Sequence, residues 1–143
     1  MKVNFFMSNY LYYEYTRSMV CKVKEDHKEY EKYPTIQRYL NIQCLENGST
    51  MRGRQDAFQF LMKQKKFTPV LISIHPVLIY FPTEAKDNPN CVWINYMEIE
   101  HVKYEKKKCT IYFKDHTQFI SYHPKRIQNS MILIKRYLLM LNR

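Results

Sequence analysis

The sequence predicts an α+β protein of mostly antiparallel sheet, with one internal helix and a closing C-terminal amphipathic helix. Short runs rich in Tyr, Val and Ile, separated by turn residues, predict the strands. Helical spacing after Ser49 and again after Pro124 predicts the two helices. Strands that are grouped, rather than strictly alternating with helices, are typical of this class, with a barrel-like closure of the sheet as an alternative. We expect one domain over residues 1–143, because a chain of this length buries a core of its own.

The N-terminal part is expected to form strands around a polar loop. Residues 10–23 (YLYYEYTRSMVCKV) are rich in β-favouring residues and predict a strand pair that turns at Thr16–Ser18. Residues 24–35 are polar and charged, which predicts a loop. Residues 36–45 (IQRYLNIQCL) partly alternate between apolar and polar, which predicts another strand, ended by Asn47-Gly48.

The internal helix is predicted over residues 50–65, with Ser49 as its N-cap. Apolar and polar side chains separate onto two sides of this stretch: Met51, Phe58, Leu61 and Met62 on one, Arg52, Gln59, Lys63 and Lys66 on the other. Gly53 weakens the prediction, since Gly costs roughly 1 kcal/mol relative to Ala inside a helix.

The second half of the chain predicts a series of strands. Residues 69–83 (PVLISIHPVLIYFPT) contain two apolar β-branched runs, which predict core strands connected at His75-Pro76. A loop is expected at 84–90. The remaining predicted elements are strands at 91–104, 109–113 and 117–121, with turns at 105–108 and 114–116.

The closing helix begins at Pro124, a position that Pro tolerates well. Its predicted core-facing stripe consists of Ile127, Met131, Ile134, Leu138 and Leu141. Ile132 and Leu139 fall on the opposite, polar side. They are either scattered surface residues, which are common, or part of a surface through which the protein forms a homo-oligomer.

The charge of the chain is strongly basic and unevenly distributed. The formal net charge is +10. Residues 49–68 carry five Lys or Arg against one Asp, and residues 103–143 carry ten against two acidic residues. Basic blocks of this kind favour a polyanion, nucleic acid first and an anionic membrane surface second, although a solubilising surface would also explain them.

The sequence argues against an enzyme and predicts no cofactor or metal. The four cysteines form no CxxC pair, and two glycines are too few for a phosphate-binding loop. The five histidines are dispersed, and nothing marks Glu98 and Glu100 as a catalytic pair. No signal peptide or membrane-spanning run is present, so we expect a cytoplasmic protein with reduced, buried thiols.

Two groups of residues are candidates for DNA contact. Helix N-termini favour phosphate, and Arg suits narrow A/T-rich minor grooves. The first group follows from this and lies along the internal helix: Arg52, Arg54, Gln55, Gln59, Lys63 and Lys66. The second group crowds one predicted hairpin, which would grip phosphates or simply form a solvated turn: Lys103, Lys106, Lys107 and Lys108.

Five segments between residues 48 and 122 together resemble the competence transcription factor ComK family of bacterial regulators. Residues 48–54 (GSTMRGR) resemble its Gly-Ser-Ser-x-x-Gly-Arg segment. The other four are Pro69-Val70, residues 79–83 (IYFPT), residues 91–94 (CVWI) and Ile120-Ser121-Tyr122, which follow in the family's order. Each segment is weak alone, and the five in order make the resemblance specific.

The resemblance implies a sequence-specific transcriptional activator of competence and DNA-uptake genes. It implies that the protein binds A/T-rich boxes through the minor groove as an oligomer and contacts RNA polymerase. Two departures are Thr50 for the second Ser and Glu84 where a Ser is more usual. The chain also ends near the close of its last helix, which makes control by a proteolytic adaptor doubtful. The alternative from another class is a non-enzymatic scaffold that binds an anionic membrane or a protein partner.

Overall fold

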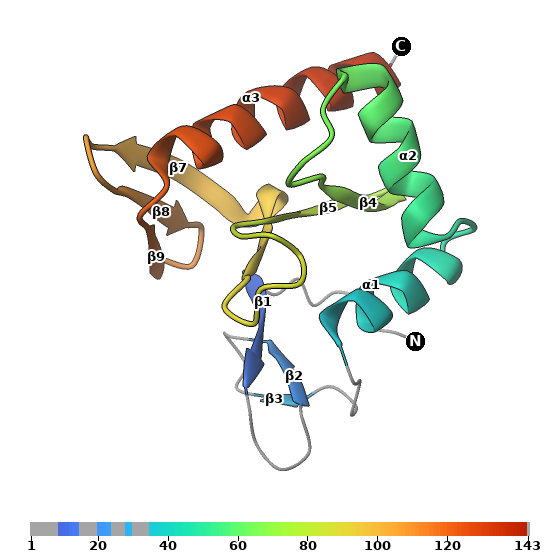
Figure 1. Ribbon diagram of the computed structural model, residues 1–143, viewed down its shortest axis with the longest axis horizontal. Coiled ribbons are helices and arrows are strands. Elements are labelled where there is room, and N and C mark those ends of the chain that lie inside the picture. The colour runs from blue at the N-terminus through green and yellow to red at the C-terminus, as the bar shows by residue number, and fades with distance from the viewer. Residues whose placement is uncertain (1–8, 15–19, 24–27, 30–34, 143) are drawn as a thin grey trace.

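The computed structural model describes residues 9–14, 20–23, 28–29 and 35–142, which form two antiparallel sheets and three α-helices (Figure 1). The predicted α+β class is confirmed. The larger sheet has the strand order β3-β2-β1-β6-β5-β4, and the smaller has the order β7-β8-β9. Both orders begin and end on edge strands, so within the described residues the barrel-like alternative is wrong.

The predicted N-terminal strand pair is present. Strand β1 (Tyr10–Glu14) pairs antiparallel with β2 (Val20–Val23), while the predicted turn at 16–18 lies outside the described residues. Strand β3 (Lys28–Glu29) pairs with β2 inside the segment predicted as a loop. Thr35 is also described, and the rest of that segment is not.

The strand predicted at 36–45 is wrong, because these residues form helix α1 (Ile36–Leu45). Its buried residues Ile36, Leu40 and Cys44 are spaced by four, so the helical period wins over the partial alternation. The Thr35 hydroxyl caps the start by accepting from the Arg38 amide at 3.0 Å. The sequence prediction of a single internal helix therefore missed α1.

Gly48 separates α1 from α2 (Met51–Met62). Its φ of +93° is a left-handed conformation that suits glycine, and its amide donates to the Leu45 carbonyl at the end of α1. The cap of α2 is Thr50 rather than the predicted Ser49, since the Thr50 hydroxyl accepts from the Gly53 amide at 2.9 Å. Helix α2 is shorter than the predicted 50–65, with Lys63 as its C-cap.

The predicted apolar hairpin is confirmed. Strands β4 (Val70–Ile74) and β5 (Val77–Pro82) pair antiparallel across a cis His75-Pro76 peptide. The strand predicted at 91–104 is instead divided between the two sheets. Strand β6 (Trp93–Asn95) pairs with both β5 and β1, a 3-10 helix (Tyr96–Glu98) follows, and β7 (Ile99–Tyr104) starts the smaller sheet.

The predicted turns and final helix are confirmed. Strands β8 (Cys109–Phe113) and β9 (Gln118–Ser121) complete the smaller sheet. Helix α3 (Pro124–Leu141) starts at Pro124 and extends across the molecule from the smaller sheet towards the end of α2 (Figure 1).

The buried stripe of α3 differs in part from the predicted one. Ile127 and Ile134 are fully buried, but Leu141 is 38% exposed. Ser130 and Tyr137 are buried instead, at the three- and four-residue spacing of one helical face. Met131 and Leu138 of the predicted stripe are half-buried beside this face and pack against the core, and the stripe leaves the core only at Leu141.

Candidate nucleic-acid interface

Arg52 is exposed at the start of α2, but most of the backbone amides there already donate hydrogen bonds within the protein and are not available to an anion. The Met51 amide donates to Asn41 Oδ1 at 2.9 Å, and the Gly53 amide donates to the Thr50 hydroxyl. Two of the first three amides of the helix are therefore already accepted within the protein. Attraction of a phosphate at this point depends mainly on the exposed Arg52 guanidinium.

Arg54 is directed into the protein. It is half-buried, its Nη2 donates to the Asn47 carbonyl at 3.3 Å, and its Nε is buried without a hydrogen-bond partner among the described residues. Its charge lies close enough to the Cys44 thiol to oppose the effect of burial, which raises the pKa of that thiol to about 11. Arg54 thus supports the connection between α1 and α2.

The two glutamines of α2 are also engaged internally. Gln55 Nε2 donates to the Thr68 carbonyl at 3.0 Å, and Gln59 Nε2 donates to the Thr68 hydroxyl at 2.8 Å. Both side chains are half-buried. Together they hold the segment before β4 against α2, so the amide nitrogens of both side chains are engaged within the protein.

The C-terminal end of α2 keeps its cations in solvent. Lys63, at the left-handed residue that ends the helix, and Lys66 are both exposed. Phe60 is 79% exposed on the same helix, which makes it the most exposed of the large hydrophobic residues in the described chain. Sequence analysis missed it, although the helical wheel separates Phe60 from the core residue Phe58.

The β7–β8 hairpin carries the second basic group. The Glu105 amide donates to the Lys108 carbonyl at 2.8 Å and closes the turn, on which Lys106 and Lys107 are exposed and Lys108 is half-buried. Lys103 is exposed on β7 opposite Thr110 of β8. These four lysines therefore lie together, as their spacing predicts.

The outer face of the smaller sheet adds aromatic surface beside these lysines. The rings of His101 and Tyr112 stack at 4.6 Å between centroids, and they pair across β7 and β8. Lys103 shares their face, because residues two apart on a strand point to the same side. Basic and aromatic side chains therefore lie side by side on this hairpin. Figure 1 shows this hairpin and α2 on opposite sides of the molecule, so the two basic groups do not form one patch.

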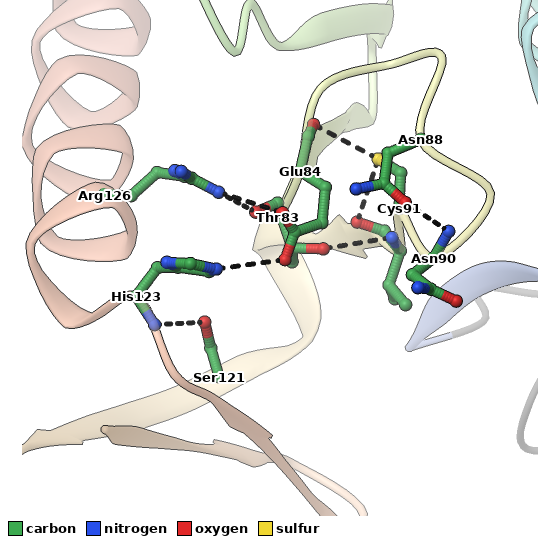
Figure 2. Close-up of polar contacts among 9 residues, drawn as sticks. Thr83, Glu84, Asn88, Asn90, Cys91, Ser121, His123 and Arg126 are labelled. Atoms are coloured by element: carbon green, nitrogen blue, oxygen red, sulfur yellow. Dashed lines mark hydrogen bonds and ion pairs between the residues drawn. The ribbon is translucent and has the colours of Figure 1, made fainter. Parts of the chain in front are cut away.

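Three of the segments that carry the family resemblance meet at the start of α3 (Figure 2). The Thr83 amide donates to the Val92 carbonyl at 2.9 Å, and the Val92 amide donates to the Thr83 hydroxyl at 3.0 Å. The Cys91 thiol donates to the Glu84 carbonyl, and the His123 amide donates to Ser121 Oγ. The residues of these segments that Figure 2 draws therefore stabilise the loop between β5 and β6 and the turn before α3.

Glu84, at which the sequence departs from the family pattern, lies within ion-pair distance of two side chains at the start of α3. Its carboxylate lies 3.3 Å from Arg126 Nη1 and 3.2 Å from His123 Nε2. Arg126 also donates to the Thr83 carbonyl at 2.8 Å and lies 4.1 Å over the Phe67 ring. Arg126 is thus engaged inside the protein rather than offered to a ligand.

The described residues show no arrangement suited to metal or thiol chemistry. No three His, Cys, Asp or Glu side chains gather as metal ligands within that part of the chain. Cys44, Cys91 and Cys109 are free and buried, and burial raises the pKa of each thiol. The expected burial is confirmed for these three, their reduced state stays a prediction, and the side chain of Cys21 lies outside the described residues.

The two residues expected to mediate self-association are both on the surface of α3. Ile132 is 45% exposed and Leu139 is 64% exposed. Lys135 and Arg136 lie between them and are also exposed, one helical turn from each. Self-association through this face remains a prediction.

A family model described as ComK protein matches residues 7–142 of the chain, a range that contains all five resembling segments. Searches of curated proteins and of solved structures each found no match. None of the described helices is long and apolar enough to cross a membrane.

Proposed function

The chain belongs to the ComK family, and on that basis we propose that it is a DNA-binding transcriptional activator of competence genes. The observation that carries the proposal is the family match over nearly the whole chain. The exposed lysines and arginine of two separate elements support it, because a polyanion would be attracted to both. The function of such a regulator requires no catalytic group.

We propose that Arg52 is the residue of α2 that enters an A/T-rich minor groove. Its guanidinium is exposed at the start of the helix, whereas Arg54, Gln55 and Gln59 have partners inside the protein. A narrow minor groove has an enhanced negative potential that attracts arginine. Lys63 and Lys66 would bind flanking phosphates.

The hairpin lysines are proposed as a second, sequence-independent contact. Lys103, Lys106 and Lys107 are exposed, and the β7–β8 hairpin that carries them lies on the opposite side of the molecule from α2 (Figure 1). A DNA duplex would have to bend around the protein, or two copies would have to share one duplex, for both groups to be used at once. We further propose, as the family resemblance implies, that a homo-oligomer binds paired boxes and that the activator contacts RNA polymerase.

The experiment that tests the function compares three ligands side by side: an A/T-rich duplex, a G/C-rich duplex and anionic vesicles. We expect tightest binding to the A/T-rich duplex, with an affinity that falls steeply as salt rises, because bound cations release counterions from DNA. A small ligand that occupies the A/T minor groove should compete. Equal binding to both duplexes would remove the sequence-specific part, and preference for vesicles would favour the scaffold alternative.

A further inference from the structure

Two apolar grooves flank Leu139 near the C-terminal end of α3. The groove on the α2 side has a volume of about 430 Å³, and its apolar lining includes Leu61, Leu133 and Met140. The groove on the side of the β4–β5 hairpin has a volume of about 480 Å³, and its apolar lining includes Ile74 and Leu138. Leu139 belongs to both grooves and forms the ridge between them.

The apolar side chains around these grooves are unusually accessible. Leu139 is 64% exposed, and Leu61, Ile74 and Leu141 are each between 38% and 39% exposed. Single exposed apolar residues are ordinary on a protein surface, but several gathered around concave surfaces indicate an interaction site.

The charges at the grooves are of one sign. Lys63 and Arg136 line the first groove, Lys135 and His75 line the second, and no acidic residue lines either. Helix α3 as a whole contains no Asp or Glu. An occupant therefore meets an apolar floor with a basic rim.

This charge distribution favours a partner other than a second copy of the chain, and so argues against the self-association predicted through Ile132 and Leu139. In a two-fold contact between α3 helices, Lys135 and Arg136 of one copy would approach the same residues of its mate. Like charges brought together in this way oppose association. The apolar floor suits side chains that leave water, which the phosphate backbone of a nucleic acid does not provide.

We propose that these grooves dock an acidic amphipathic helix of a protein partner. Apolar residues spaced three and four apart on such a helix would enter the grooves on either side of Leu139. Carboxylates on its flanks would face Lys63, Lys135 and Arg136. The grooves lie at the opposite end of α2 from Arg52 and share only Lys63 with the proposed DNA-binding residues. The proposal does not depend on DNA binding.

The test uses a fluorescent 18-residue helical peptide with Leu on one face and Glu on the other. A matched peptide with Lys in place of Glu is its control. Fluorescence anisotropy should show saturable binding of the Glu peptide to the full chain, weakened by salt, and at least tenfold weaker binding of the Lys peptide. Absence of binding by the Glu peptide, or equal binding of both peptides, would overturn the proposal.

Variants locate the site. Leu139→Ser and the charge reversal Arg136→Glu should each weaken binding of the Glu peptide about tenfold. Lys86→Glu, which makes the same charge change on an exposed loop outside the grooves, should change it less than twofold. Circular dichroism establishes that each variant is folded. An equal effect of Lys86→Glu and Arg136→Glu would show non-specific attraction and contradict the docking site.

Two further measurements separate this proposal from others. Light scattering of Leu139→Ser should show the oligomeric state of the unchanged protein, whereas a shift to monomer would mean that a second copy covers the grooves. The A/T-rich duplex should not displace the Glu peptide from Lys63→Ala, a variant that lacks the one residue shared with the proposed DNA contacts. Displacement from this variant would assign the grooves to DNA. The peptide assay gives its answer whether or not the protein binds DNA.

Discussion

Replacing Arg52 and Arg54 separately by Ala tests whether the two arginines of α2 differ in role as the structure indicates. Arg52 is exposed, and Arg54 is half-buried with its Nη2 on the Asn47 carbonyl. We expect Arg52→Ala to leave the free energy of unfolding within about 0.5 kcal/mol, as for most surface changes. It should reduce the affinity for an A/T-rich duplex by about 1–3 kcal/mol, the usual size of one specific groove contact.

Arg54→Ala should have the opposite pattern. Hydrogen bonds from charged donors contribute about 1.5–3 kcal/mol, and the 3.3 Å length of this bond places it at the lower end. Truncation also removes aliphatic packing from a half-buried position, so we expect a loss of about 1.5–2.5 kcal/mol in the free energy of unfolding. Affinity for duplex, measured where the variant is fully folded, should fall less than for Arg52→Ala.

Urea denaturation and duplex titration at one salt concentration measure the two effects, and Arg54→Lys controls for charge. Lysine keeps the charge but lacks the planar guanidinium, so its stability should lie between those of the Ala variant and the unchanged protein. The assignment is refuted if Arg54→Ala is as stable as the unchanged protein and loses more affinity than Arg52→Ala.

Four further experiments test other parts of the structure. Lys107→Ala should weaken binding to A/T-rich and G/C-rich duplexes alike and reduce the salt slope by about 1, as loss of a phosphate contact does; a selective loss on one duplex would contradict this. Phe60→Ala should leave stability unchanged, because its side chain is 79% exposed, and should weaken duplex binding if the ring packs against DNA, which titration measures. Native alkylation followed by mass spectrometry should leave Cys44, Cys91 and Cys109 unmodified, since their thiols are buried. Burial alone would raise the pKa of Asp115, but hydrogen bonds from Thr117 and Asn9 outweigh this effect and lower the pKa below its usual 3.8. The ionised carboxylate therefore stabilises the folded protein above about pH 4, and this contribution is lost as the pH falls further. Asp115→Asn should therefore show a smaller loss of stability on acidification than the unchanged protein, which urea titrations at a series of pH values measure.

Sequence reasoning succeeded where a local pattern decides the structure. The β4–β5 hairpin and the start of α3 at Pro124 follow from apolar runs and from the conformational limits of proline, both of which neighbouring residues determine. The strand prediction for residues 36–45 failed because the apolar positions of this segment fit both a strand and a helix. Only burial of Ile36, Leu40 and Cys44 on one side selects the helix.

The prediction of one strand over residues 91–104 failed for a different reason. Asn95 is fully buried, and its side chain accepts from the Met97 amide at 3.1 Å, which starts a 3-10 turn. The chain then leaves the larger sheet and begins the smaller one at Ile99. This division depends on contacts with distant strands, which the alternation of residues 91–104 does not report.

In the candidate interface too, the local sequence predicted where charges cluster but not which charged side chains have partners inside the fold. Clustering of lysines along the chain correctly predicted that Lys103 and the turn lysines lie together, because a hairpin keeps sequence neighbours close. It did not distinguish Arg52 from Arg54, since that difference depends on the Asn47 carbonyl seven residues away. A polar side chain with a partner inside the fold must lose that bond before it binds a ligand, so it contributes less net affinity than an equally charged side chain in solvent. For a basic domain the informative quantity is therefore the number of cations left without internal partners. In this protein α2 and the β7–β8 hairpin, which both carry exposed cations, lie on opposite sides of the molecule (Figure 1).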